Sequence, residues 1–239
     1  LHHATGSAGP ALEFNGPELP AHPWPSSPAR CEFQGAALPV EFQWLRTPQP
    51  DRLFSLTVRP GFLRLFGRES LGSLYESSLV ARRQQAFEFE ATTRLEFEPE
   101  HFQQSAGLVC YYNGHKFHYL FVSRDETVGL HLGIMSCEGD QSLATVYPLQ
   151  SSPVSLPEDT AIFLRASVDR ASLRFTWSAD GESWREVGDV LDYGLLCDEV
   201  GKGEGANFTG AFVGISCQDI AGTGLHADFD FFEYRERPA

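Results

Sequence analysis

The sequence predicts an all-β fold, an antiparallel β-sandwich or jelly roll, and three observations support this prediction. From about residue 40 onward, apolar residues recur with a period of two, which is the alternation of side chains along a β-strand. Clusters of Pro, Gly, Asn and Asp separate about a dozen short runs of this kind. No long stretch carries an apolar stripe with helical spacing, so alternating helices between the strands are not expected.

The clearest strand is residues 87–98, FEFEATTRLEFE. One predicted face carries Phe87, Phe89, Ala91, Thr93, Leu95 and Phe97. The other carries mostly glutamates, so we expect a long strand with one buried and one solvated side. The other predicted strands, in chain order, are residues 52–58, 61–67, 128–136, 161–169, 172–178, 211–217 and 227–235.

Residues 102–126 predict a hairpin whose strands are apolar on both faces. Asn113-Gly114 suits a tight turn with positive φ at both central residues. Phe117, Tyr119 and Phe121 share one face of the second strand, and His118, Leu120 and Val122 share the other. One face serves the core, whereas the face with His118 and with Tyr111 or Tyr112 has to meet a sugar, another domain or a crossing loop. A hydrogen-bonded structural histidine is the alternative for His118.

Composition restricts the function classes. The chain has 239 residues, 32 acidic against 18 basic, and a formal charge of −14, which repels phosphate backbones and anionic lipids. We therefore expect neither nucleic acid nor membrane partners. The five cysteines are far apart, without metal-ligand spacing, which favours reduced and mostly buried thiols, a cytoplasmic location, and no metal or other cofactor.

The expected domain organisation has three parts. Residues 1–10 resemble an affinity-tag and cloning remnant, and residues 11–30 are a Pro-rich linker that we expect to lead out of a catalytic domain absent from this chain. Residues 31–237 form a single β-sandwich domain.

Two stretches could carry catalytic carboxylates. SADGESW, residues 178–184, is one residue short of a sialidase aspartate box, and a strand pair turned by Asp-Gly explains it. DFDFFE, residues 228–233, has spacing similar to the acids of jelly-roll glucanases. Strand parity places Asp228 and Asp230 on one face and Glu233 on the opposite one, unless a bulge resets the register, so a solvated acidic strand is the simpler prediction.

Six blocks in order resemble a known family: FQWLRTP, SLTVRPGFLRL, ESLGSLYESSLVARRQQ, FEPEHFQQSAGLVCYYN, FTGAFVGISCQD and ADFDFFEYRER. Together they are similar to the C-terminal concanavalin A-like β-sandwich of glycoside hydrolase family 43 β-xylosidases, over roughly residues 31 to 237. Where an Asp-Asp-Phe-Asp opening is expected, this chain has Cys31-Glu32-Phe33-Gln34, which argues against a cation site at that edge.

The resemblance implies that catalysis takes place elsewhere. The family's carboxylates lie on a five-bladed propeller that releases xylose, and often arabinose, so no catalytic residue is expected in this chain. The sandwich packs on the propeller and contributes a loop to its pocket, in full-length enzymes that are oligomers. The best candidate for that loop is GKGEGANFTG, residues 201–210, in which Phe208 either covers a sugar-sized site or starts the next strand.

Three hypotheses follow. The chain is a pocket-completing accessory domain of a xylan-degrading β-xylosidase, with a xylo-oligosaccharide at the domain interface. Alternatively, it is a carbohydrate-binding module in which Trp44, Tyr111 or His118 lines a groove. The third hypothesis is an autonomous jelly-roll glycosidase that uses Asp228, Asp230 and Glu233.

Overall fold

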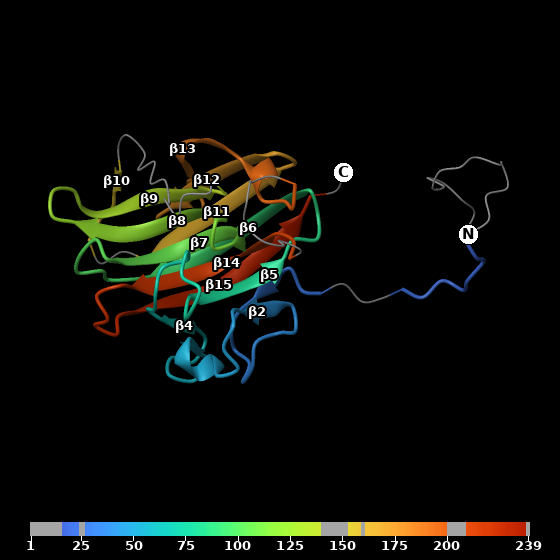
Figure 1. The fold of residues 1–239 in the computed structure, drawn as a ribbon, viewed down its shortest axis with the longest axis horizontal. Coiled ribbons are helices and arrows are strands. Elements are labelled where there is room, and N and C mark those ends of the chain that lie inside the picture. Colours follow the sequence, from blue (N-terminus) through green and yellow to red (C-terminus); the bar gives the residue numbers. More distant parts are fainter. Residues whose placement is uncertain (1–15, 24–26, 140–152, 159–160, 200–208, 238–239) are drawn as a thin grey trace.

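The computed structural model describes residues 16–23, 27–139, 153–158, 161–199 and 209–237. Residues 1–10, the predicted tag remnant, therefore lie outside the described residues. The described part of the Pro-rich segment before Arg30 is exposed and runs outside the sandwich (Figure 1). The helices among the described residues are two single turns of 3-10 type, Pro50–Arg52 and Tyr193–Leu195, and no helix there is long and apolar enough to cross a membrane.

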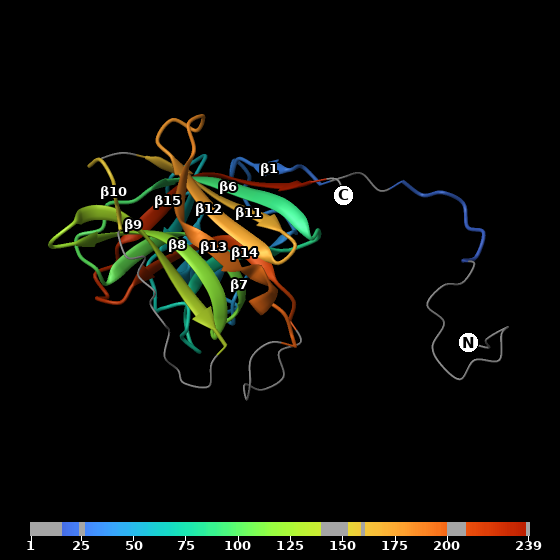
Figure 2. The same cartoon turned by 90° about the horizontal axis from the view of Figure 1, so that it is seen from above.

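Two antiparallel sheets face each other and form the predicted sandwich (Figures 1 and 2). In the eight-stranded sheet the order is β13 (Arg185–Asp192), β12 (Ser172–Ser178), β11 (Ile162–Asp169), β6 (Glu88–Glu96), β15 (His226–Glu236), β4 (Leu63–Phe66) and β3 (Phe54–Ser55), with β1 (Arg30–Cys31) also pairing with β15. In the seven-stranded sheet the order is β10 (Val154–Ser155), β9 (Gly129–Glu138), β8 (Lys116–Asp125), β7 (Gln104–Asn113), β14 (Phe212–Asp219), β5 (Ser78–Arg83) and β2 (Phe42–Trp44).

The core lies between the sheets. On β6 the predicted inner residues are buried, from Phe89 to Leu95, while Phe87 precedes the strand and is 75 % exposed. None of the five cysteines forms a disulfide, and Cys110, Cys137 and Cys217 are buried, as predicted. Burial raises the pKa of the Cys110 thiol far above its ordinary value, so it stays protonated.

The predicted hairpin forms, but its turn differs from the prediction. Neither Asn113 nor Gly114 has a positive φ. The register shifts by a bulge between Tyr111 and Asn113, and the Asn113 side chain accepts a hydrogen bond of 2.8 Å from the backbone N–H of His115. The turn is therefore closed by a side chain, which removes the need for a mirror-image backbone turn.

Candidate functional site

His118 lies on the inner face of β8 and is 1 % exposed. Its Nε2 donates to the backbone carbonyl of Asp192 at 3.1 Å, so Nδ1 accepts from the Ser136 hydroxyl at 2.8 Å. The serine–histidine distance suits a catalytic dyad, but Ser136 is also 1 % exposed, so no substrate reaches it. The structural alternative for His118 agrees with this geometry.

Of the two tyrosines predicted as alternatives for the His118 face, Tyr112 lies in the inner cluster and Tyr111 does not. Cys110 is the residue opposite His118, and Tyr111 is opposite Phe117. Because side chains alternate along a strand, Tyr111 lies with Phe117, Tyr119 and Phe121 on the outer face of the seven-stranded sheet.

Burial lowers the pKa of His118 below its ordinary value, although its hydrogen bond to the Asp192 carbonyl opposes this. In the unfolded chain the imidazole takes up a proton at about pH 6.5, so His118 contributes to a loss of stability as the pH falls below that value. We expect the difference in unfolding free energy between the wild type and His118→Gln to shrink from pH 7.5 to pH 5. Urea denaturation at both pH values measures it, and a constant difference would contradict a neutral buried His118.

A crossing segment covers the middle of the outer face. We call residues 67–77, which join β4 to β5, the strap. The Leu71 side chain is 1 % exposed and belongs to the cluster of Tyr111, Phe117 and Tyr119, and its N–H donates to Gln218 Oε1 at 3.2 Å. The second apolar face of the hairpin therefore meets a crossing loop of the same chain, which was one of three alternatives.

Trp44 and Tyr111 come together in one groove beside the strap, which we call the Trp44 groove. Its volume is about 360 Å³, and Leu45, Leu79, Phe212 and Thr209 also line it. Trp44 is 36 % exposed, and its indole N–H donates to the Thr47 carbonyl at 3.0 Å. Burial raises the pKa of the Tyr111 hydroxyl, with Arg46 partly offsetting the rise. The groove is mainly apolar, so it suits an apolar partner surface or a sugar ring.

The predicted loop residue Phe208 lies outside the described residues, as does Asn207. Thr209, which follows them, is held from both sides. Its hydroxyl donates to the Tyr112 carbonyl at 3.2 Å, and the Arg83 guanidinium donates to the Thr209 carbonyl.

A second groove on the outer face was not predicted, and we call it the Phe102 groove. It measures about 660 Å³ and lies on the far side of the strap from Trp44. Phe102 is 74 % exposed and Ile220 is 55 % exposed at its rim, with Phe121 and His131 in its lining. Phe102 begins the hairpin stretch, and a phenylalanine in a polar loop was the only available signal for it.

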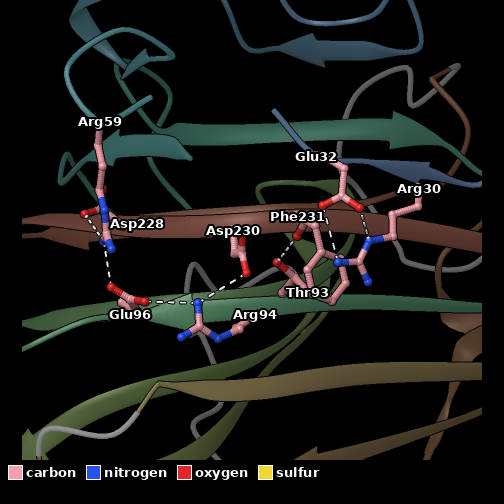
Figure 3. Close-up of polar contacts among 9 residues, drawn as sticks. All are labelled: Arg30, Glu32, Arg59, Thr93, Arg94, Glu96, Asp228, Asp230 and Phe231. Carbon is pink, nitrogen blue, oxygen red and sulfur yellow. Dashed lines mark hydrogen bonds and ion pairs between the residues drawn. The ribbon is translucent and has the colours of Figure 1, made fainter. Parts of the chain in front are cut away.

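The acidic motif of β15 occupies the outer face of the eight-stranded sheet (Figure 3). Phe229 pairs with Leu95 and Phe232 with Thr93, so a bulge at residues 230–231 resets the register. Both phenylalanines belong to the core, and Asp228 and Glu233 therefore face the same way. The sequence placed Glu233 on the opposite face unless a bulge reset the register, and this bulge is the exception that applies.

Arginines pair with all three carboxylates of this motif. Figure 3 shows two of these pairs, Asp228 with Arg59 and Asp230 with Arg94. Asp228 accepts two hydrogen bonds of 2.7 Å from Arg64 and one of 2.8 Å from Arg59. Although burial alone raises the pKa of Asp228, the hydrogen bonds from Arg64 and Arg59 outweigh it and hold the pKa below its ordinary value.

The neighbouring carboxylates follow the same pattern. Asp230 pairs with Arg94 at 3.2 Å, and Glu233 pairs with Arg235 at 2.9 Å. The general acid of a glycosidase has to hold a proton, whereas an arginine pairs with each of these three carboxylates and favours its charged form, which argues against an autonomous glycosidase on β15.

The SADGESW stretch is a turn between β12 and β13. The Asp180 carboxylate accepts from the N–H of Ser183 at 2.7 Å and of Glu182 at 2.8 Å. The backbone hydrogen bond from Ser183, the Ser178 hydroxyl and the backbone N–H of Glu182 hold the pKa of Asp180 well below its ordinary value. The strand pair turned by Asp-Gly, with Gly181 at φ +79°, is confirmed.

At the start of the domain, Cys31-Glu32-Phe33-Gln34 replaces the Asp-Asp-Phe-Asp expected of the family, and Glu32 and Phe33 make structural contacts there. Glu32 pairs with Arg30 at 2.6 Å, and Phe33 is buried in the core. Among the described residues, no group of three or more His, Cys, Asp or Glu side chains is arranged to hold a metal ion.

Comparison with known proteins identifies the domain. The family model described as "Beta xylosidase C-terminal Concanavalin A-like domain" matches residues 30–235. A putative beta-xylosidase of Escherichia coli is 45 % identical over 206 residues, covering 86 % of this chain and 38 % of that protein. The beta-xylosidase of Bacillus subtilis is 38 % identical over 236 residues, covering 98 % of this chain and 44 % of that protein.

A solved structure agrees. The xylan beta-1,4-xylosidase from Bacillus halodurans superposes with a TM-score of 0.85 at 40 % identity, covering 92 % of this chain and 41 % of that one. The chain thus spans less than half the length of each of these three proteins. It belongs to the C-terminal concanavalin A-like domain family of glycoside hydrolase family 43 β-xylosidases.

Proposed function

We propose that this chain is the accessory C-terminal domain of a β-xylosidase, packing on a propeller catalytic domain of the same polypeptide and helping to shape its pocket. The observation that carries the proposal is the Trp44 groove, an apolar hollow with Thr209, a residue of the predicted pocket loop, in its lining. Large exposed apolar surfaces of this kind mark interfaces with other domains. The arginine-paired acids of β15 fit an accessory rather than a catalytic role.

The parent enzyme acts, in this proposal, on xylo-oligosaccharides and assembles into a homo-oligomer. Relatives support the substrate class: the Humicola insolens protein that is 41 % identical over 202 residues is called a xylosidase/arabinosidase, so arabinose release belongs to the same proposal.

Truncating Trp44 tests the docking. In the full-length enzyme, Trp44→Ala is expected to raise KM for xylobiose about tenfold, because a buried tryptophan at the centre of an interface commonly contributes on the order of 2 kcal/mol. The control is Trp184→Ala on the opposite sheet, where Arg165 lies 3.6 Å from the ring centroid. Equal KM values for the wild type and Trp44→Ala, with an unchanged melting temperature of the isolated domain, would exclude the Trp44 groove as the docking surface.

Carbohydrate binding is the second candidate function, and the Phe102 groove favours it. An exposed phenylalanine ring offers a stacking surface, and neither lysine nor arginine is present among the described lining residues, which suits an uncharged sugar. Titration of this chain with xylohexaose tests it. Millimolar or tighter binding that is lost in Phe102→Ala supports the candidate, whereas binding unaffected by that change would place any sugar site elsewhere.

A further inference from the structure

Lys116 is an unusual residue for the interior of a β-sandwich. It is 0 % exposed, and it is the only lysine among the described residues; the other, Lys202, lies in the segment 200–208. Burying an ammonium group costs several kcal/mol unless hydrogen bonds compensate. Lys116 has the strand parity of His118, Leu120 and Val122, so its side chain starts from the inner face of β8.

The ammonium group of Lys116 contacts one end of the connection between β13 and β14, and we call the two ends of this connection its stems. Its Nζ donates to the backbone carbonyl of Cys197 at 2.9 Å and lies 5.1 Å from the ring centroid of Tyr112. His118, two residues further along β8, holds the same stem through the carbonyl of Asp192. This first stem, residues 192–199, therefore has two buried anchors on one strand.

Tyr112, whose ring lies beside the Lys116 ammonium group, also contacts the second stem, which begins at Thr209. The Thr209 hydroxyl donates to the Tyr112 carbonyl, and the Thr209 N–H lies 3.5 Å from the Tyr112 hydroxyl. A groove of about 330 Å³ lies between the stems, with Tyr112, Cys197 and Gly210 in its lining. The end of the hairpin is thus a common base for both stems.

We propose that Lys116 is a positioning residue: with Tyr112 it fixes Cys197 and Thr209, which belong to the two ends of the connection between β13 and β14. An apolar residue would fill the same space without the desolvation cost, so the ammonium group serves placement rather than stability. The consequence for catalysis rests on the proposed function, in which this connection reaches the pocket of the catalytic domain.

The test is Lys116→Met, which keeps the length of the side chain and removes its charge and donors. Hydrogen exchange of peptides covering residues 192–199 and 209–211 is expected to become about tenfold faster or more, the factor given by loss of one charge-assisted hydrogen bond. Exchange in β11 and β12 is expected to stay unchanged. The matched control is Val122→Ala on the same strand, which removes buried methyl groups and lowers the melting temperature without selective loosening of the stems.

Unchanged exchange in both stems of Lys116→Met, or an equal acceleration across the whole sandwich, would overturn the proposal. In the full-length enzyme we expect Lys116→Met to raise KM for xylobiose while leaving kcat within about twofold, since the reacting groups are untouched. Faster stem exchange with an unchanged KM would support Lys116 as a positioning residue and count against the pocket role of the connection.

Discussion

Replacing Gly107 with alanine is expected to lower the free energy of unfolding by at least about 3 kcal/mol and the melting temperature by roughly 6–12 °C. Gly107 lies in the middle of β7, opposite Phe121 on β8. A Cβ at this position would lie 2.0 Å from the Leu120 carbonyl oxygen and 2.8 Å from the Phe121 Cα. Both are backbone atoms of the adjacent strand, so relief requires β7 and β8 to separate and lose ladder hydrogen bonds.

Urea and thermal denaturation followed by circular dichroism measure this effect. Gly72→Ala is the matched control, because a Cβ at Gly72 would meet nothing closer than the Gly114 carbonyl oxygen at 3.5 Å. Similar unfolding free energies for the two variants would show that the sheet accommodates a side chain at Gly107 without cost.

The alternation of apolar and polar residues along the sequence predicted the strands that bury one full face. β6, β11 and β12 have apolar inner residues at every second position, and their predicted and observed bounds agree within one residue at most ends. The Asp-Gly turn implied a partner strand for β12, but the bounds of β13 were not predicted, because it is an edge strand with a single buried residue, Val187, and its Val190 is exposed. An edge strand gains little from burial, so its sequence carries little pattern.

The sequence could not settle which apolar face of the hairpin was the core. Both faces of β8 are apolar, and the choice depends on the strap, in which Leu71 is buried against the outer face while Leu74 and Tyr75 are exposed. Phe117, Tyr119 and Phe121 are buried because this distant segment crosses them. Long-range coverage of this kind leaves no local periodicity to detect.

Strand alternation also could not predict which face the β15 acids occupy. A bulge adds one residue to one strand, so every side chain after it lies on the face opposite to the one that alternation predicts. In the structure, the Thr93 hydroxyl donates to the Phe231 carbonyl at 2.6 Å inside the bulge, and the Arg30 guanidinium lies 3.5 Å from the Phe231 ring centroid. These contacts come from β6 and β1. The bulge therefore depends on residues far away in the chain.

Asp228→Asn is expected to destabilise the domain by about 3 kcal/mol at pH 7, because it leaves Arg64 with a neutral partner and Arg59 with Glu96, at a site where the Asp228 side chain is only 7 % exposed. The folded pKa of Asp228 is depressed, so its contribution is fully present above the unfolded value of about 3.9 and is lost as the pH falls through the folded value. The difference between wild type and variant should therefore shrink only below about pH 4.

Asp230→Asn is the matched control on the same ladder. The Asp230 side chain is 34 % exposed and has a single arginine partner, Arg94, so a loss within about 1 kcal/mol is expected. Urea denaturation from pH 7 to pH 3 distinguishes the two carboxylates. If Asp228→Asn lowers the free energy of unfolding no more than Asp230→Asn does, the pairs of Asp228 with Arg64 and Arg59 are screened by solvent like other surface ion pairs. The bulge would then be held by Thr93 and the Phe231 contacts alone.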